Sequence, residues 1–159
     1  MAPTGDGSES SQTQGDELCL VLDNAIGAVE AGQRQLEAYL EPYGLASIVL
    51  HRVEVIFEEV VSNAVRHGFT PGSDQSIIVR ITVGTDLIDM VFEDDGVPFD
   101  PLQAPAPAPF GALEDAKLGG LGIAMVIRLA HGVRYERPES TDAGFRPANR
   151  LTVTVAATA

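Results

Sequence analysis

The sequence predicts an α+β domain, a two-layer α/β sandwich in which helices cover one face of a mixed, mostly antiparallel sheet. Apolar residues recur at helical spacing over 26–43 and 45–65, whereas they alternate with polar residues over 77–83 and 88–93. The predicted order is strand, helix, helix, strand, strand, long loop, helix, strand, strand. Apolar residues make up 45% of the 159 residues, which is enough for one hydrophobic core.

The first half of the chain is predicted to hold one strand and two helices. Residues 17–22 form a short apolar run, and Asp23 or Asn24 is expected to cap the helix that follows. The second helix carries the longest apolar stripe and is expected to end before Gly68. Residues 1–16 are almost wholly polar, so we expect a disordered tail there and a single domain over 17–159.

The second half begins with two strands that are joined by a hairpin at residues 84–86. Five prolines in residues 97–112 exclude a regular helix or a central strand, and loops of this length are often functional lids. A nearly all-apolar helix is expected to follow Gly119 and Gly120 and to end at Ala130. Two further strands are expected over 132–137 and 149–155.

Charge and composition exclude several classes of protein. The chain has 10 basic against 23 acidic residues, a formal charge of −13, which argues against nucleic acid as a direct partner. The longest strongly apolar stretch, residues 118–130, is shorter than the roughly 20 residues that span a bilayer. Because the N-terminus also lacks a secretory pattern, we expect a cytoplasmic protein without a membrane partner. Cys19 is the only cysteine, and no zinc-ligand spacing is present.

The second helix carries a candidate pair of site residues, Glu59 and Asn63. Their i, i+4 spacing places a carboxylate and an amide on one face of the helix. The amide oxygen is a suitable hard ligand for Mg²⁺, and the carboxylate could orient or deprotonate an attacking hydroxyl. The simpler interpretation of such a pair is two solvated side chains.

A second candidate lies at the end of the predicted strand over residues 88–93. Asp94 has the parity of Ile88, Met90 and Phe92, so its side chain should face the helix layer. An inward carboxylate needs a donor, for which the 6-amino group of adenine is suitable. Gly96 would let the backbone approach a base closely. An ordinary Asp-Gly turn is the alternative.

The third candidate is the start of the apolar helix, Gly119-Gly120-Leu121-Gly122. Small residues there leave backbone N–H groups open at the positive end of the helix dipole, as a phosphate site requires. Lys117, the only lysine, lies two residues earlier and is either a phosphate contact or a solvated side chain.

Together and in this order, the ExxxN helix, the DxGxP strand end, the long loop and the GGxG helix start resemble the boxes of the GHKL or Bergerat-fold ATPases. Four local segments resemble the anti-sigma-factor serine/threonine kinases, which carry this histidine-kinase-like ATPase domain. They are EEVVSNAVRHGF, FEDDGVPFDP, GGLGIAMVIRLA and NRLTV. The resemblance runs from about Leu18 to Val155.

The resemblance implies a role for each matching residue. Glu59 corresponds to the catalytic glutamate, Asn63 to the Mg²⁺ ligand and Asp94 to the adenine-binding aspartate. The close-packing glycine and the two glycines near the phosphates correspond to Gly96, Gly120 and Gly122. Such proteins use ATP and Mg²⁺, form homodimers, bind a sigma factor and phosphorylate a STAS-domain anti-sigma-factor antagonist. The Ala/Pro-rich loop with little positive charge departs from the family pattern.

Three alternatives remain open. One is a switch that binds nucleotide and partner without phosphotransfer. Another is the catalytic domain of a histidine kinase, which is disfavoured because only about 16 residues precede the domain and no dimerisation helix is found among them. The last is an α/β domain whose turns and glycines match the boxes by chance, which predicts no nucleotide binding.

Overall fold

The computed structural model describes residues 16–68, 74–103, 120–137 and 149–159. The expected tail over residues 1–16, apart from Asp16, lies outside these ranges. The same holds for residues 104–112 of the proline-rich loop, for Lys117 and Gly119, and for the segment 138–148 that precedes the last strand.

Within the described residues, five strands form one sheet in the order β1-β2-β3-β5-β4. Their bounds are Leu18–Asp23 (β1), Ser76–Val83 (β2), Leu87–Asp94 (β3), Gly132–Glu136 (β4) and Asn149–Ala156 (β5). All four neighbouring pairs are antiparallel, so the described sheet has no parallel pair where a mixed one was expected. The hairpin between β2 and β3 closes with a 2.9 Å hydrogen bond from Gly84 N to Leu87 O, as predicted.

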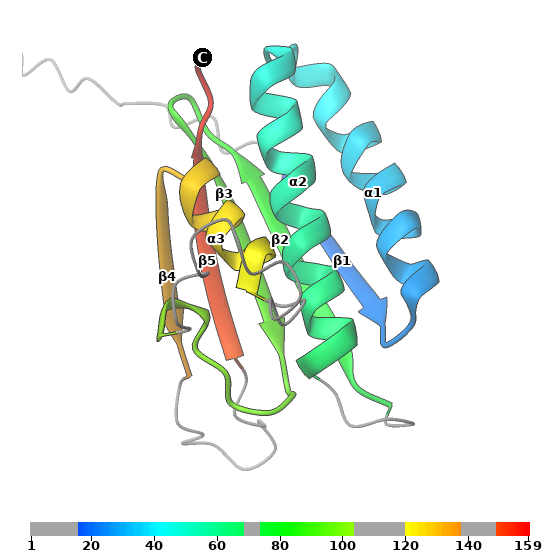
Figure 1. Cartoon of the computed structure of the whole chain (residues 1–159). Coiled ribbons are helices and arrows are strands. Elements are labelled where there is room, and N and C mark those ends of the chain that lie inside the picture. The colour runs from blue at the N-terminus through cyan, green and yellow to red at the C-terminus, as the bar shows by residue number, and fades with distance from the viewer. Residues whose placement is uncertain (1–15, 69–73, 104–119, 138–148) are drawn as a thin grey trace, which may run out of the picture.

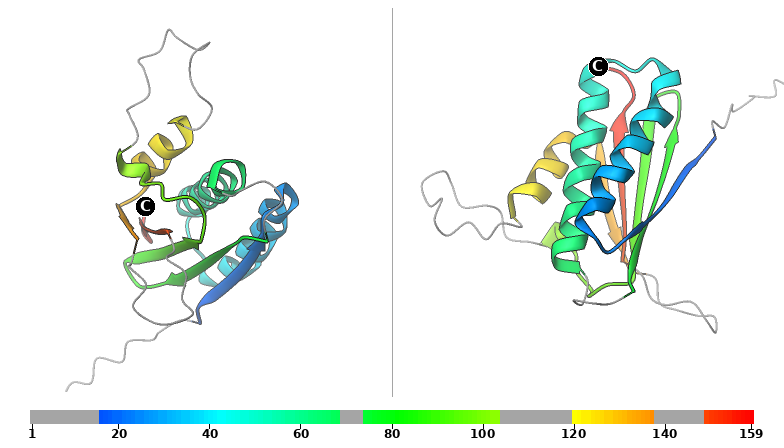
Figure 2. Two further views of the ribbon diagram at one scale, coloured as in Figure 1. Left: turned by 90° about the horizontal axis from the view of Figure 1, so that it is seen from below. Right: turned by 90° about the vertical axis from the view of Figure 1, so that its right-hand side faces the viewer.

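In the parts of the chain that the structure describes, three α-helices cover one face of this sheet (Figures 1 and 2). They are α1 (Ile26–Leu40), α2 (Ser47–Asn63) and α3 (Gly120–Leu129). Helix α2 lies between the other two and packs against both. The predicted two-layer α+β architecture is therefore confirmed.

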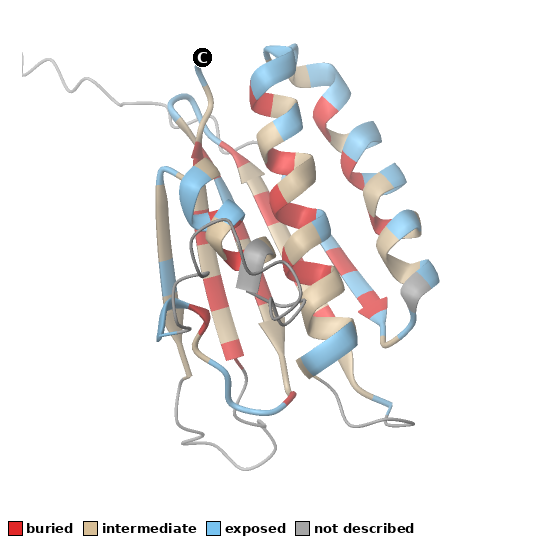
Figure 3. Ribbon diagram, in the orientation of Figure 1, coloured by how far each residue is buried: buried red, intermediate tan, exposed pale blue. Residues whose placement is uncertain are grey.

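The core lies between the helices and the sheet. Alternate residues of β2, β3 and β5 are buried, and the buried residues of α2 face them at helical spacing (Figure 3). The largest fully buried side chains include Phe57, Leu36, Leu40, Ile56, Ile77, Ile81, Ile88 and Met90. In β3, every second residue faces the helix layer. Asp94 lies two positions after Phe92 and is therefore on the same side of the strand.

Two helix ends differ from the sequence prediction. The N-cap of α1 is Ala25, and no side chain caps this end of the helix. Asp23 is still part of β1, and it contributes only its backbone carbonyl, which accepts a 2.7 Å hydrogen bond from Ala25 N. Neither Asp23 nor Asn24 is thus the N-cap residue. At its other end, α1 stops at Leu40 and a 3₁₀ turn with Pro42 follows.

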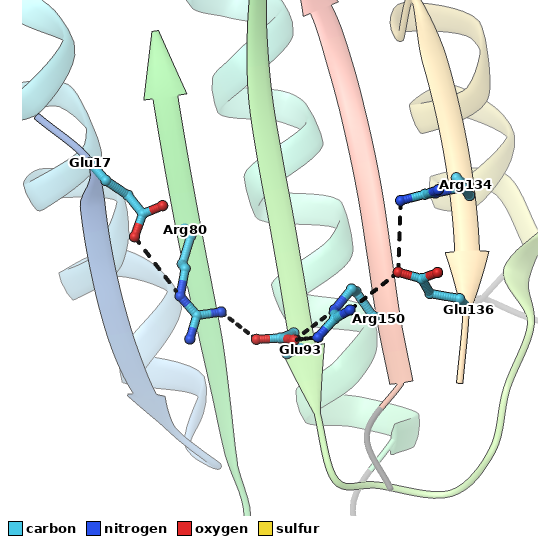
Figure 4. Close-up of polar contacts among 6 residues, drawn as sticks. All are labelled: Glu17, Arg80, Glu93, Arg134, Glu136 and Arg150. Carbon is cyan, nitrogen blue, oxygen red and sulfur yellow. Dashed lines mark hydrogen bonds and ion pairs between the residues drawn. The ribbon is translucent and has the colours of Figure 1, made fainter. Parts of the chain in front are cut away.

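The opposite face of the sheet carries a chain of ion pairs (Figure 4). It consists of six side chains that alternate in charge across the strands, Glu17, Arg80, Glu93, Arg150, Glu136 and Arg134. Glu93 is the centre, paired with Arg80 and with Arg150 at 2.6 Å. Burial alone would raise the pKa of Glu93, but the hydrogen bonds from both arginines outweigh it and hold the pKa below its usual value.

None of the helices within the described ranges is long and apolar enough to cross a membrane.

Candidate functional site

Glu59 and Asn63 lie one turn apart near the C-terminal end of α2, and both side chains are partly buried. Asn63 is the last residue of the regular helix, because Ala64–Gly68 continue as a π-helical turn. Such turns often occur at functional sites. The predicted pair therefore lies where the helix changes its hydrogen-bonding pattern.

The Glu59 carboxylate lies against the first turn of α3. A Cβ atom added at Gly122 would be only 2.2 Å from Glu59 Oε2, so the carboxylate occupies the space that a side chain would need. Helix α3 begins at Gly120, inside the glycine-rich stretch that was predicted to precede and start it. Glycine at position 122 thus lets a carboxylate of α2 approach a helix start, where unpaired N–H groups favour anions.

Asp94 ends β3, and its carboxylate accepts two hydrogen bonds on the same oxygen. Oδ1 accepts from Gly96 N and from Asn149 Nδ2, both at 2.9 Å. Burial raises the pKa of Asp94, which the hydrogen bonds from Asn149 and Gly96 only partly offset. Because both hydrogen bonds formed within the described residues use Oδ1, Oδ2 is available to a donor such as an exocyclic amino group.

Gly96 is required by the protein's own backbone. A Cβ at Gly96 would lie 2.0 Å from the carbonyl oxygen of Gly68, which accepts a 2.9 Å hydrogen bond from Val97 N. The C-terminal residue of the π-helical turn thus fills the space that a side chain at position 96 would need, and the access of a base to Gly96 stays a prediction. The contact joins the end of α2 to the loop after β3, and so brings the segment that follows Asn63 beside Asp94.

Asn149 is a site residue for which the sequence patterns predict no role. It is the first residue of β5, pairs with Asp94 of β3, and is 7% exposed. Its side-chain amide connects Asp94 to β4 and the residue just after it, because Tyr135 of β4 and Arg137 donate to Asn149 Oδ1 at 2.6 and 2.8 Å. The alternation of apolar and polar residues in this strand places Asn149 on the same inward face as Leu151. The same kind of alternation identified Asp94, so it could also have identified Asn149.

The charge around Asp94 is mixed. Arg137 NH1 reaches the carbonyl oxygen of Gly96 at 3.4 Å, and its charge lowers the pKa of Asp94, while the neighbouring Asp95 raises it. The carboxylate itself receives its hydrogen bonds from two neutral donors. It therefore keeps acceptor capacity that a directly paired arginine would remove.

The donor set is compatible with magnesium bound together with a phosphate ligand. Within the described ranges, no group of three or more His, Cys, Asp or Glu side chains is arranged to hold a metal ion. Mg²⁺ usually takes one or two protein oxygens and completes its shell with water and phosphate. The amide of Asn63 and the carboxylate of Glu59 are oxygen ligands of the kind that this ion prefers.

Comparison with known proteins identifies the family. The family model for the histidine kinase-like ATPase domain matches residues 22–146. The chain therefore belongs to the histidine kinase-like ATPase domain family. Its resemblance to the anti-sigma kinases within this fold is confirmed by the relatives that follow.

Two curated relatives are named as serine or serine/threonine kinases. Serine/threonine-protein kinase BtrW of Bordetella bronchiseptica is 31% identical over 50% of this chain and 56% of its own length. The match therefore spans little more than half of that relative. Serine-protein kinase RsbW of Listeria monocytogenes is 25% identical over 77% of this chain and 80% of its own length.

The fold is shared with a solved structure. The crystal structure of the RsbU and RsbW domains of a Mycobacterium tuberculosis protein superimposes with a TM-score of 0.60 at 20% identity. The superposition covers 88% of this chain and 32% of the mycobacterial one. At this identity the likeness supports the fold alone, and it agrees with helices packed on a five-stranded antiparallel sheet.

Proposed function

We propose that the chain is an ATP-dependent serine/threonine protein kinase that phosphorylates a STAS-domain anti-sigma-factor antagonist and sequesters a sigma factor. The observation that carries this proposal is the Glu59 carboxylate against the first turn of α3, where Gly122 leaves room for it. That arrangement puts a candidate base beside a candidate phosphate site. Kinase activity also agrees with the names of the curated relatives.

The proposed reaction is in-line transfer of the γ-phosphoryl group of ATP. Asp94 Oδ2 accepts a hydrogen bond from the adenine 6-amino group, and the N–H groups at the start of α3, from Gly120 to Gly122, bind phosphate oxygens. Glu59 aligns the incoming serine hydroxyl and accepts its proton. The serine oxygen forms the new bond to phosphorus, the bond to the β-phosphate oxygen breaks, and ADP leaves.

Asn63 is proposed to hold Mg²⁺ through its amide oxygen. When bound, the ion neutralises phosphate charge. Such compensation is needed because the chain carries a net charge of −13, which repels a polyanionic nucleotide on average. Lys117 is proposed to add a phosphate contact.

The partners follow from the same assignment. We propose a cytoplasmic homodimer with a sigma factor and a STAS-domain antagonist as its protein partners, and without direct binding to nucleic acid or membrane. The name of the Listeria relative, serine-protein kinase RsbW, supports this assignment.

A second candidate is a nucleotide-dependent switch that binds its partner without phosphotransfer. The proline-rich loop favours it, because residues 97–112 hold five prolines and no lysine or arginine. A loop without positive charge gives little stabilisation to phosphate charge in a transition state.

Labelled ATP mixed with candidate STAS domains separates the two candidates. We expect phosphate on a serine of the substrate, and we expect Glu59→Gln to lower the transfer rate by about 100-fold or more. The matched control is Glu58→Gln, which changes the exposed neighbour that binds Gln33 at 3.3 Å and should leave the rate unchanged. Nucleotide binding without transfer to any STAS domain supports the switch, and equal loss in both variants contradicts the role of Glu59.

A further inference from the structure

Asn149 is the only buried polar side chain among the described residues, and it lies beside the carboxylate proposed to select adenine. We propose that Asn149 is a positioning residue that sets the purine preference of the site, by holding Asp94 with one oxygen turned toward the 6-position of the base. This inference rests on the proposed nucleotide site. It assigns a role to a residue outside the ExxxN, DxGxP and GGxG motifs.

The orientation of the Asn149 amide is fixed by its neighbours. Its Nδ2 group faces two acceptors, Asp94 Oδ1 and Val97 O, each at 2.9 Å. Its Oδ1 atom faces the donors Tyr135 OH at 2.6 Å and Arg137 NH1 at 2.8 Å. An arginine only donates and a carbonyl only accepts, so the reversed amide would oppose like groups on both sides.

This orientation determines which Asp94 oxygen remains available. Asn149 and Gly96 N both donate to Oδ1, so within the described residues Oδ2 keeps its lone pairs for a ligand. An acceptor at this place binds the 6-amino group of adenine and opposes the 6-oxo group of guanine.

Asn149 also separates Arg137 from Asp94. The Arg137 guanidinium donates to Asn149 Oδ1 at 2.8 Å and to Gly96 O at 3.4 Å, instead of pairing with the carboxylate. A guanidinium can bind both oxygens of a carboxylate at once. Removing the Asn149 amide would let Arg137 take Oδ2, and the acceptor for the base would be lost.

The same side chain fixes the loop that follows Asp94. Its amide binds the carbonyl of Val97 at 2.9 Å and accepts a longer hydrogen bond from Phe99 N at 3.4 Å. One residue of β5 therefore holds both the carboxylate and the backbone next to it. Loss of the Asn149 side chain is therefore expected to change which base is selected and to leave phosphate binding unchanged.

The test compares ATP with purine riboside triphosphate, which is identical except that it lacks the 6-amino group. Affinities for both, with Mg²⁺, are measured by titration calorimetry. We expect Asn149→Ala to weaken ATP binding about tenfold and the analogue by no more than about twofold, because a hydrogen bond to a charged group is lost only for ATP. Asn24→Ala, in the turn between β1 and α1, is the matched control and should change neither affinity.

The outcomes separate this inference from the proposed function. A parallel loss of both affinities in Asn149→Ala indicates a purely structural role and overturns the inference, as does an unchanged preference for ATP. A wild type that binds neither nucleotide overturns the proposed nucleotide site itself. If Asn149→Ala does not fold, Tyr135→Phe removes the 2.6 Å hydrogen bond to Oδ1 and should reduce the preference for ATP by about threefold, while an unchanged preference overturns the inference.

Discussion

Gly122→Ala displaces the Glu59 carboxylate without removing it. The new Cβ would lie 2.2 Å from Glu59 Oε2, whereas ordinary contact begins at 3.4 Å, so the oxygen has to retreat by about 1.2 Å. A displacement of about 1 Å of a catalytic group can lower a rate about 100-fold. We therefore expect the rate of phosphotransfer to fall by about two orders of magnitude.

The same substitution should not weaken the fold. The atom that must move is the end of a flexible side chain, and alanine replaces glycine inside α3, where it is favoured by about 0.5–1 kcal/mol. We expect the free energy of unfolding, measured by urea denaturation, to stay constant or rise slightly. Gly27→Ala in α1 is the matched control, since its Cβ would meet nothing within 4 Å, and its transfer rate should equal that of the wild type.

The rate is measured as labelled phosphate transferred to the STAS substrate at saturating ATP. A wild-type rate in Gly122→Ala would show that the position of the Glu59 carboxylate does not matter for transfer, contrary to its proposed role. An unfolded variant would contradict the structural half of the argument. In a Glu59→Gln background, Gly122→Ala should cause little further loss, since the displaced group is already inactive.

Three further predictions concern stability. Gly96→Ala should lower the free energy of unfolding in urea by about 1–3 kcal/mol, because the new Cβ would lie 2.0 Å from the carbonyl oxygen of Gly68, a backbone atom that cannot swing aside as a side chain can. Asp94→Asn should raise the melting temperature of the nucleotide-free protein at pH 7, since burial raises the pKa of Asp94 and a neutral amide removes the buried charge. Glu93→Gln should cost about 1–2 kcal/mol at pH 7, because it removes the charge between two arginines and replaces one of the two acceptor oxygens by an amide nitrogen that cannot accept. That cost should shrink in acid. The pKa of Glu93 is lowered by folding, so the contribution of its charge is complete above the unfolded pKa and is lost as pH falls through the folded one.

Each of these has a distinct contrary result. An undiminished difference between Glu93→Gln and wild type at pH 3 would show that the ion pairs are not its cause. Glu17→Gln is the control, since this half-exposed carboxylate lies 3.9 Å from Arg80 and should change stability by less than about 0.5 kcal/mol. Wild-type stability in Gly96→Ala would mean that the Gly68 segment yields, and a less stable Asp94→Asn would mean that the Asp94 charge stabilises the fold.

Local patterns of the sequence predicted most of the fold. The alternation of apolar and polar residues in β2 and β3 predicts which face of each strand is buried. The same alternation predicts that Asp94 faces the helices. Helical spacing alone put Glu59 and Asn63 on one face of α2. These features depend only on residues a few positions apart, so a single sequence is sufficient to find them.

The parts that were missed depend on contacts between distant segments. Asn149 is a site residue because β5 pairs with β3 in the register that sets it opposite Asp94, 55 residues earlier. The sequence already identifies Gly96 as a candidate, but the contact that requires glycine there, with the carbonyl of Gly68, depends on the π-helical turn after α2. Neither the register nor the turn has a local signal in the chain.

The most direct test of the proposed nucleotide site is a thermal-shift titration of the wild type and Asp94→Asn with Mg-ATP, Mg-GTP, and ATP plus chelator. At about 100 times the dissociation constant, a ligand stabilises the folded state by about 2.7 kcal/mol. We predict a shift of the wild type with Mg-ATP that GTP does not reproduce, that the chelator weakens, and that Asp94→Asn loses because an amide donor replaces Oδ2. A wild type without any shift, or a shift that Asp94→Asn retains in full, would contradict the account.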